Sequence, residues 1–213
     1  MNNPLDKWKG QFGDEYAERN KIEPELIEAR TNFWMSIFQS MNYVPNSMLE
    51  IGAGNGQNMM AIGAAITLLS NERSPIKCFL SATEPNQEAR ANLLINAPYV
   101  NIYPDSIYDI KQASGSIDFV FTSGVLIHIP PDQLDKAVSE MYRVSSKYIL
   151  CAEYFSPQCE EIKYQEQEGL LWRSDFGGVF LDKYKLRVIN YGFCWKRITK
   201  LDNLTWWLME KTH

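Results

Sequence analysis

The chain has 213 residues, of which 45% are hydrophobic and 22% charged, a composition typical of one globular domain. Its formal net charge of -5 argues against nucleic-acid binding, which normally depends on clustered Lys and Arg. No apolar run is long enough to span a bilayer, and the polar stretch 1–8 does not resemble a signal peptide. We therefore expect a cytoplasmic protein with no membrane partner. The four cysteines form no Cys-x-x-Cys pair, which predicts idle thiols and no metal site.

The segment before residue 47 has a helical pattern. Residues 1–22 are polar with scattered aromatic side chains, which predicts a short helical arm. A clearer helix begins at Pro24, because proline is favoured in the first helical turn. Apolar residues at helical spacing continue from there to Met41, and we expect this stripe to pack in the core.

From residue 47 the pattern alternates between short strands and helices. The predicted strands are 47–51, 77–83, 100–104, 117–122 and 147–154. The predicted helices between them are 56–69, 88–96 and 131–144. Strands that alternate with helices form parallel βαβ units, which indicates an open sheet covered on both faces.

The C-terminal part has a different pattern. Residues 156–183 are polar with aromatic side chains, and we interpret them as an insertion over the active site. Two further strands, 186–195 and 203–210, follow with no helix predicted between them. Consecutive strands of this kind predict an antiparallel hairpin at the edge of the sheet.

A glycine-rich turn joins the first strand to its helix. Gly52, Gly54 and Gly56 allow the backbone to approach a ligand closely, and the helix that follows offers free N–H groups. A dinucleotide site would place a glycine at position 57, which is Gln57 here, and a P-loop would require a lysine that is absent. The alternative interpretation is a chance glycine-rich loop.

Polar residues follow the other predicted strands. Glu84 ends the second strand, where a carboxylate can accept hydrogen bonds from ribose hydroxyls, unless it is simply solvated. Asp105 follows the third strand and a proline, which is also a common turn pair. Thr122, Ser123 and Gly124 end the fourth strand, at the edge where parallel sheets bind ligands.

His128 is one of two histidines in the chain and follows the fourth strand closely. An imidazole beside a ligand-facing strand can accept a proton near neutral pH. The alternative is a packing residue that caps the next loop.

The stretch 49–56, Leu-Glu-Ile-Gly-Ala-Gly-Asn-Gly, resembles motif I of the class I S-adenosylmethionine (SAM)-dependent methyltransferases. The resemblance implies an α/β, Rossmann-like fold: a mostly parallel seven-stranded sheet, helices on both faces and an antiparallel C-terminal hairpin. It implies SAM as the cofactor, with the motif's acid supporting the turn and the acid after the third strand bonding adenine. The implied cofactor-binding residues are Glu50, Gly52, Ala53, Gly54, Gly56, Asn58, Glu84, Pro85, Asp105, Ser106, Ile107, Thr122, Ser123 and Gly124.

The flanks are similar to the methylases found with pseudaminic acid biosynthesis, a group that accompanies bacterial genes for nine-carbon acidic sugars and surface glycans. The matching segments are 12–20, 124–129, 173–176 and 191–207. The resemblance implies methyl transfer to a hydroxyl or amine of a small, acidic sugar or related metabolite.

Roles in this reaction follow from residue chemistry, except that the lid role of Tyr16 and Arg19 is implied by the resemblance to related small-molecule methyltransferases. His128 would be the catalytic base. Tyr16 and Arg19 would close over the cofactor as a lid and contact the acceptor. Arg173, with Tyr154, would bind an anionic acceptor, because guanidinium pairs well with carboxylate, unless Arg173 instead forms a surface salt bridge with Asp175.

We expect one methyltransferase domain over 1–213, acting as a monomer or homodimer. Within it, 1–45 would form a helical lid, 46–155 the cofactor-binding core, 156–183 a cover over the substrate and 184–213 the edge strands. Three alternatives remain open on sequence alone: a nicotinamide-dependent oxidoreductase, a non-catalytic Rossmann-like binding protein, and a methyltransferase with another small-molecule or protein acceptor.

Overall fold

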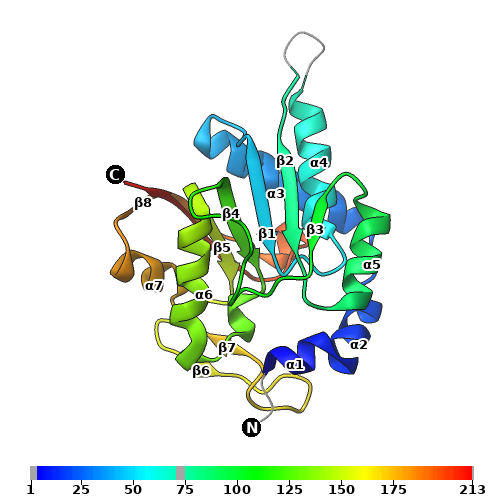
Figure 1. Ribbon diagram of the computed structural model, residues 1–213, viewed down its shortest axis with the longest axis vertical. Coiled ribbons are helices and arrows are strands. Elements are labelled where there is room, and N and C mark those ends of the chain that lie inside the picture. Colours follow the sequence, from blue (N-terminus) through cyan, green and yellow to red (C-terminus); the bar gives the residue numbers. More distant parts are fainter. Residues whose placement is uncertain (1–3, 71–74, 213) are drawn as a thin grey trace.

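The computed structural model describes residues 4–70 and 75–212. One seven-stranded sheet dominates it, with the strand order β3-β2-β1-β4-β5-β9-β8 (Figure 1). The strands are β1 (Ser47–Ile51), β2 (Phe79–Thr83), β3 (Asn101–Tyr103), β4 (Ile117–Ser123), β5 (Ser145–Glu153), β8 (Leu186–Phe193) and β9 (Thr205–Lys211). Strands β1 to β5 pair in parallel, and β9 runs antiparallel to both β5 and β8. The predicted Rossmann-like class I methyltransferase fold, with its antiparallel C-terminal hairpin, is confirmed.

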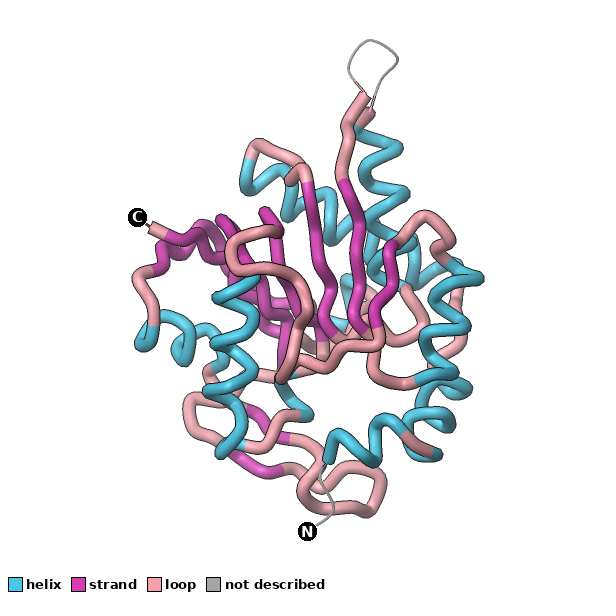
Figure 2. Tube along the Cα trace, in the orientation of Figure 1, coloured by secondary structure: helices cyan, strands magenta, loops and turns pink. Residues whose placement is uncertain are grey.

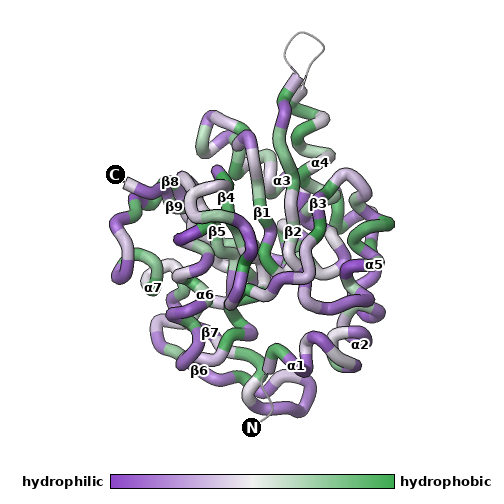
Figure 3. Tube along the Cα trace, in the orientation of Figure 1, coloured by the Kyte–Doolittle hydropathy of each residue, from purple (hydrophilic) through white to green (hydrophobic). Residues whose placement is uncertain are grey.

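Helices cover both faces of the sheet. They are α1 (Pro4–Lys9), α2 (Gln11–Arg19), α3 (Pro24–Met41), α4 (Gln57–Leu69), α5 (Gln87–Asn96), α6 (Pro131–Val144), α7 (Phe176–Lys183) and α8 (Lys196–Thr199). The core has two parts because successive strand residues point to opposite faces. Phe119 and Phe121 pack with α3 and α4, whereas Val120 packs with α6 and α7. Figure 3 shows the hydrophobic residues concentrated along the central strands.

The order of the strands creates a crevice. The chain winds outward from β1 through β2 to β3, then returns to place β4 on the other side of β1. Ligands bind at such a reversal, beyond the carboxyl ends of the strands. In Figures 1 and 2 these ends point towards helices α1 and α2 and towards the small two-stranded sheet of β6 (Glu160–Glu161) and β7 (Trp172–Arg173).

The C-terminal region differs from the prediction in two details. Helix α7 lies inside the predicted insertion 156–183, but its Phe176 and Phe180 are buried in the sheet core beside α6. Only the part before α7 therefore stands at the crevice. The connection between β8 and β9 contains the single-turn helix α8, which was not predicted because four residues are too few for a periodic pattern.

No helix among the described residues combines the length and the hydropathy that crossing a membrane requires.

Candidate functional site

A cavity of about 480 Å³ lies at the carboxyl edge of the sheet. Its walls come from the ends of β1, β2, β4 and β5, from helices α1, α2 and α3, and from the 164–171 and 194–204 segments. Segments distant in sequence thus meet around one open cavity that the glycine turn also lines.

The glycine turn forms the floor of this cavity, and its backbone conformation and surroundings require glycine. Gly52, Gly54 and Gly56 all have positive φ angles of 71°, 53° and 86°, which favour glycine. A Cβ at Gly56 would lie 2.3 Å from the side chain of Leu93, so that position also requires a small residue. A Cβ placed on Gly54 would have no atom within 4 Å, apart from those of Gly54 and its two neighbours in the chain. Gly54 therefore presents bare backbone to the cavity.

Glu84 holds the turn in place. One carboxylate oxygen accepts the N–H of Gly54 at 2.8 Å, and the other accepts the N–H of Asn86 at 2.8 Å. The side chain is almost fully buried, and burial raises its pKa while these two hydrogen bonds lower it. The end of β2 and the cofactor turn are thereby connected through one carboxylate that also lines the cavity.

Glu50 lies beneath the turn, in a buried chain of polar contacts. Its Oε1 accepts a hydrogen bond of 2.6 Å from the amide of Asn58, and burial raises its pKa to about 8. Arg30, from α3, donates to Asn58 Oδ1 and to Gln57 Oε1, both at 3.1 Å. Both of these acceptors are neutral. Among the described residues, Glu50 Oε2 and Arg30 Nε are buried without any partner.

His128 lies in a 3-10 turn after β4, Leu126–His128, and lines the same cavity. Its Nδ1 lies 2.6 Å from the carbonyl oxygen of Leu170. A carbonyl can only accept, so Nδ1 carries the proton and Nε2 keeps its lone pair. Burial lowers the pKa of His128 to about 4. The imidazole is thus neutral at physiological pH and offers a fixed hydrogen-bond acceptor.

Glu153, at the end of β5, supports the loop that carries His128. Its fully buried carboxylate accepts the N–H groups of Val125 and Ile127, each at 3.3 Å. Burial raises the pKa of this carboxyl to about 7, and the hydrogen bonds offset part of that rise.

Helices α1 and α2 cover the cavity and are attached to its floor. Asn86 donates to the carbonyl of Trp8 at 3.2 Å and to the carboxylate of Asp14 at 2.7 Å. Asn55, inside the glycine turn, donates to the carbonyls of Ala17 and Asn20 at 2.7 and 2.8 Å. The cover and the turn are therefore connected by hydrogen bonds from two asparagines.

Most of the residues predicted for the site do line the cavity: Tyr16, Arg19, Glu50, Gly52, Ala53, Gly54, Asn58, Glu84, Pro85, Ile107, Ser123, Gly124, His128 and Tyr154. Five others are not among the lining residues: Gly56, Asp105, Ser106, Thr122 and Arg173. Asp105 instead accepts the N–H of Lys111 at 2.9 Å, and Thr122 is fully buried in the sheet. Arg173 lies exposed on β7, and Asp175 caps α7 through Gly178 N–H at 2.9 Å.

Sequence reasoning did not identify Arg30, Asn55, Asn86, Glu153 or Tyr164. Asn55 had a usable signal, because it stands inside the glycine turn. Arg30 lies on a helix that was interpreted only through its apolar stripe, and Tyr164 is one aromatic residue in a polar segment. Their positions depend on how distant segments pack.

Comparison with protein-family models gives a match that includes the residues of this site. Residues 49–148 match the family model described as a methyltransferase domain. This match contains the glycine turn, Glu84 and His128. No sequence among curated proteins matches the chain.

Solved structures of methyltransferases have the same fold. A SAM-dependent methyltransferase from Leishmania major has a TM-score of 0.72 at 14% identity, with 98% of this chain and 87% of that one covered. The 1,6-didemethyltoxoflavin-N1-methyltransferase of Burkholderia thailandensis has a TM-score of 0.70 at 12% identity, with 100% and 92% covered. The magnesium protoporphyrin IX methyltransferase of Synechocystis has a TM-score of 0.68 at 9% identity, with 100% and 99% covered.

Proposed function

Because this chain is a SAM-dependent methyltransferase, we propose that it transfers the methyl group to a hydroxyl or amine of a small, anionic sugar or related metabolite, in the synthesis of bacterial surface glycans. The observation that carries this proposal is the cavity itself. It joins a cofactor half around the glycine turn to a second half around His128 that is lined by tyrosines.

The cofactor half fits SAM. The methionine end of SAM carries an ammonium and a carboxylate, and the buried unpartnered atoms Glu50 Oε2 and Arg30 Nε are complementary to these two charges. The open backbone at Gly54 leaves room for the cofactor, and Glu84 would hold the ribose hydroxyls. Ile107 would pack on the adenine. When bound, SAM supplies a methyl group already activated by a sulfonium.

The protein's own part in the reaction is to orient the acceptor and exclude water. His128 Nε2 would accept a hydrogen bond from the nucleophilic O–H or N–H and so direct a lone pair towards the cofactor. Its low pKa makes the imidazole a weak base, so orientation is its main contribution. The covering helices α1 and α2 would keep water out.

The anionic sugar is supported by the resemblance of the flanking segments and by Arg19 at the rim of the cavity. The fold does not select an acceptor, since the similar structures named above act on a toxoflavin precursor and on a porphyrin. We propose a cytoplasmic enzyme, as expected from the sequence, acting as a monomer or homodimer.

Two measurements test the proposal. Calorimetric titration should show binding of SAM and S-adenosylhomocysteine and none of NAD. A methyl-transfer screen should then give turnover with nine-carbon acidic sugars or their nucleotide-activated forms and less with neutral sugars. Turnover only with neutral or cationic acceptors would contradict the proposed acceptor class and leave the cofactor assignment intact.

A further inference from the structure

We propose that the hydroxyls of Tyr16, Tyr154 and Tyr164 form an anion-binding subsite that holds a carboxylate or phosphate group of the acceptor. The inference rests on the proposed function and deepens it, because it assigns the recognition of the acceptor's negative charge to three neutral donors. The sequence expectation already placed Tyr16 and Tyr154 at the acceptor but assigned its charge to Arg173, whereas the subsite assigns it to these two tyrosines and Tyr164.

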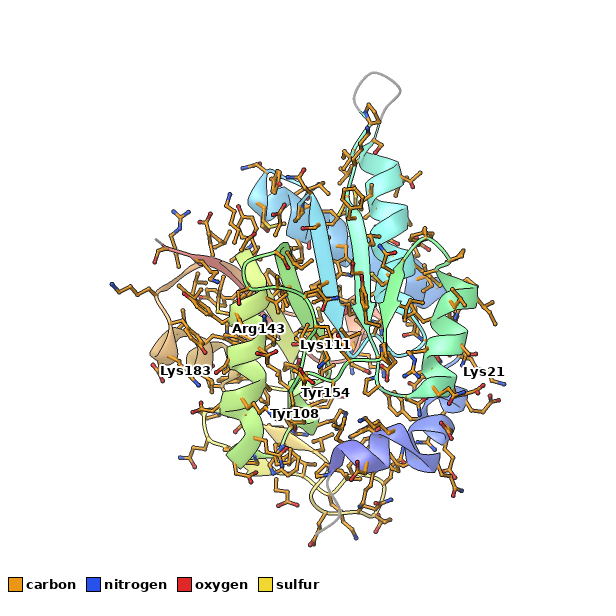
Figure 4. All side chains as sticks on the ribbon, viewed as in Figure 1. Lys21, Tyr108, Lys111, Arg143, Tyr154 and Lys183 are labelled. Atoms are coloured by element: carbon orange, nitrogen blue, oxygen red, sulfur yellow. The ribbon has the colours of Figure 1, made fainter. Side chains whose placement is uncertain are left out.

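The three tyrosines reach one part of the cavity from separate segments. Tyr16 comes from α2, Tyr154 follows β5 directly, and Tyr164 lies in the segment between β6 and β7. The ring of Tyr16 lies 5.3 Å from that of Trp8, and the ring of Tyr164 lies 5.5 Å from that of His128. Figure 4 shows Tyr154 between the lower ends of the central strands and helix α1.

None of the three hydroxyls forms a hydrogen bond with any residue that the structure describes. Burial and the neighbouring Tyr164 and Tyr154 raise the pKa of Tyr16 to about 12, so its hydroxyl stays protonated. Burial also raises the pKa of Tyr154 and Tyr164. The cavity therefore contains three hydroxyls for which the described residues supply no partner, and because none of these oxygen atoms is fully buried, all three can reach a ligand in the cavity.

An anionic oxygen group is the best hydrogen-bond partner for three such hydroxyls. A carboxylate or phosphate accepts several hydrogen bonds at once, and bonds to a charged acceptor are about twice as strong as neutral ones. A single neutral hydroxyl of a ligand has too few lone pairs to serve three donors. A cationic group would bring more donors to a place that already has an excess of them.

Charges of both signs surround the trio. Arg30, Arg19 and Arg173 each lower the pKa of one of the three tyrosines, against the larger effect of burial. Asp202 raises the pKa of all three, and Glu153 also raises that of Tyr154. The side chain of Asp202 is 57% exposed and pairs with Lys196 at 2.9 Å, so solvent and a partner both weaken its field.

The subsite also defines the shape of the acceptor. His128 Nε2 accepts a hydrogen bond, whereas the tyrosines beside it donate. The acceptor would therefore carry a nucleophilic O–H or N–H for His128 and, on the same small molecule, an anionic group for the tyrosines. A neutral sugar or a simple amine has only the first of these features.

The test uses the full chain saturated with S-adenosylhomocysteine, which keeps probes away from the cofactor half. Inorganic phosphate, acetate, glycerol and tetramethylammonium are titrated separately and followed by NMR shifts. We expect millimolar binding of phosphate or acetate, weakened about 10-fold in Tyr16→Phe, Tyr154→Phe and Tyr164→Phe, as expected for loss of one hydrogen bond to a charged group. The relative affinities of phosphate and acetate distinguish the two anion classes.

Tyr191→Phe is the matched control, because Tyr191 is 69% exposed on β8 and does not line the cavity. It should bind the anions as the unmodified protein does. Equal or tighter binding of glycerol or tetramethylammonium, or anion binding that survives the triple Phe variant, overturns the subsite. A protein that fails to bind S-adenosylhomocysteine at all would instead contradict the proposed function.

Discussion

At the scale of single residues, the site contains ionisable groups whose pKa values are shifted by burial. Glu50 and Glu153 are buried carboxyls without a salt bridge among the described residues, and burial raises the pKa of both. His128 is kept neutral by the same desolvation. Burying such groups lowers stability. Glu50 lies under the glycine turn and Glu153 supports the His128 loop, and buried ionisable groups with shifted pKa values are typical of functional sites.

Glu153→Gln tests this cost through pH. The pKa of Glu153 is raised from its ordinary 4.5 to about 7, so the folded state binds more protons than the unfolded state between these values. The free energy of unfolding of the unmodified protein should therefore fall as pH rises through this range. The free energy of unfolding of Glu153→Gln, relative to that of the unmodified protein, should therefore rise by roughly 3 kcal/mol from pH 4 to pH 8, as measured by urea unfolding.

The control for this series is Glu168→Gln, which changes an exposed glutamate outside the cavity. This variant removes one carboxyl of the same type, so the two differences from the unmodified protein are compared at each pH. A Glu153→Gln difference that stays constant with pH would contradict the raised pKa of Glu153.

His128→Ala tests orientation by the imidazole. We expect kcat to fall about 10- to 100-fold, with unchanged affinity for S-adenosylhomocysteine, because the proposed role of Nε2 is to bind the acceptor and not the cofactor. Because the pKa of His128 is about 4, the kcat profile of the unmodified enzyme should show no inflection from this residue between pH 5.5 and 8. Full turnover in the alanine variant would refute the role.

At the scale of elements, the glycine turn and the covering helices behave as one unit. All three glycines of the turn have positive φ angles, which favour glycine. Hydrogen bonds from Asn55 to α2 and from Asn86 to α1 connect the covering helices to the turn and to the end of β2. Asn86 also caps α5, because its Oδ1 accepts the N–H of Ala89 at 2.8 Å.

Gly54→Ala and Gly56→Ala should separate cofactor binding from folding. Both place a side chain at positive φ, which costs about 1 kcal/mol or more. At Gly56 the added Cβ also meets Leu93, so we expect the larger loss of stability there, about 2–4 kcal/mol. At Gly54 the space is open, so the main effect should be weaker SAM binding by calorimetry. The reverse order would contradict the assignment of the open position to the cofactor.

Asn86→Asp should release the cover without removing the cap. The new carboxylate can still accept from Ala89 N–H, but it cannot donate to the Trp8 carbonyl and it repels Asp14. Amide exchange in α1 and α2 should become faster, and SAM affinity should fall several-fold. Asn101→Asp, on the exposed start of β3, adds the same charge and should change neither quantity.

At the scale of the whole molecule, the sheet supports a cavity at its carboxyl edge. The two core clusters fill both faces, and each contributes residues to the wall of that cavity, such as Ala152 from one cluster and Ile51 and Leu171 from the other. Segments from the N-terminus, from 164–171 and from 194–204 reach this edge over long sequence distances. The edge can therefore vary in its acceptor side while the sheet and the glycine turn stay the same.

The sequence by itself determined the sheet, because its evidence is local. Strand 47–51, helix 131–144 and the glycine spacing each depend on neighbouring residues, so period and turn chemistry were enough to place them. The same holds for Glu84, whose strand-end position follows from the preceding strand. The single-turn helix α8 escaped prediction because it is too short to show a period.

Only the tertiary structure decided which side chains meet. Arg30 reaches Asn58 across 28 residues, Asn86 reaches Trp8 across 78, and Leu170 sets the tautomer of His128 across 42. No local pattern encodes such pairs, since they depend on how the covering segments pack on the sheet edge. The alternative interpretation of Arg173, a salt bridge with Asp175, is not found among the described residues, because the Asp175 carboxylate caps α7 instead. Residues on both sides of the cavity, such as Glu84 and His128, could therefore be placed near it from sequence, whereas the contacts between distant segments required the fold.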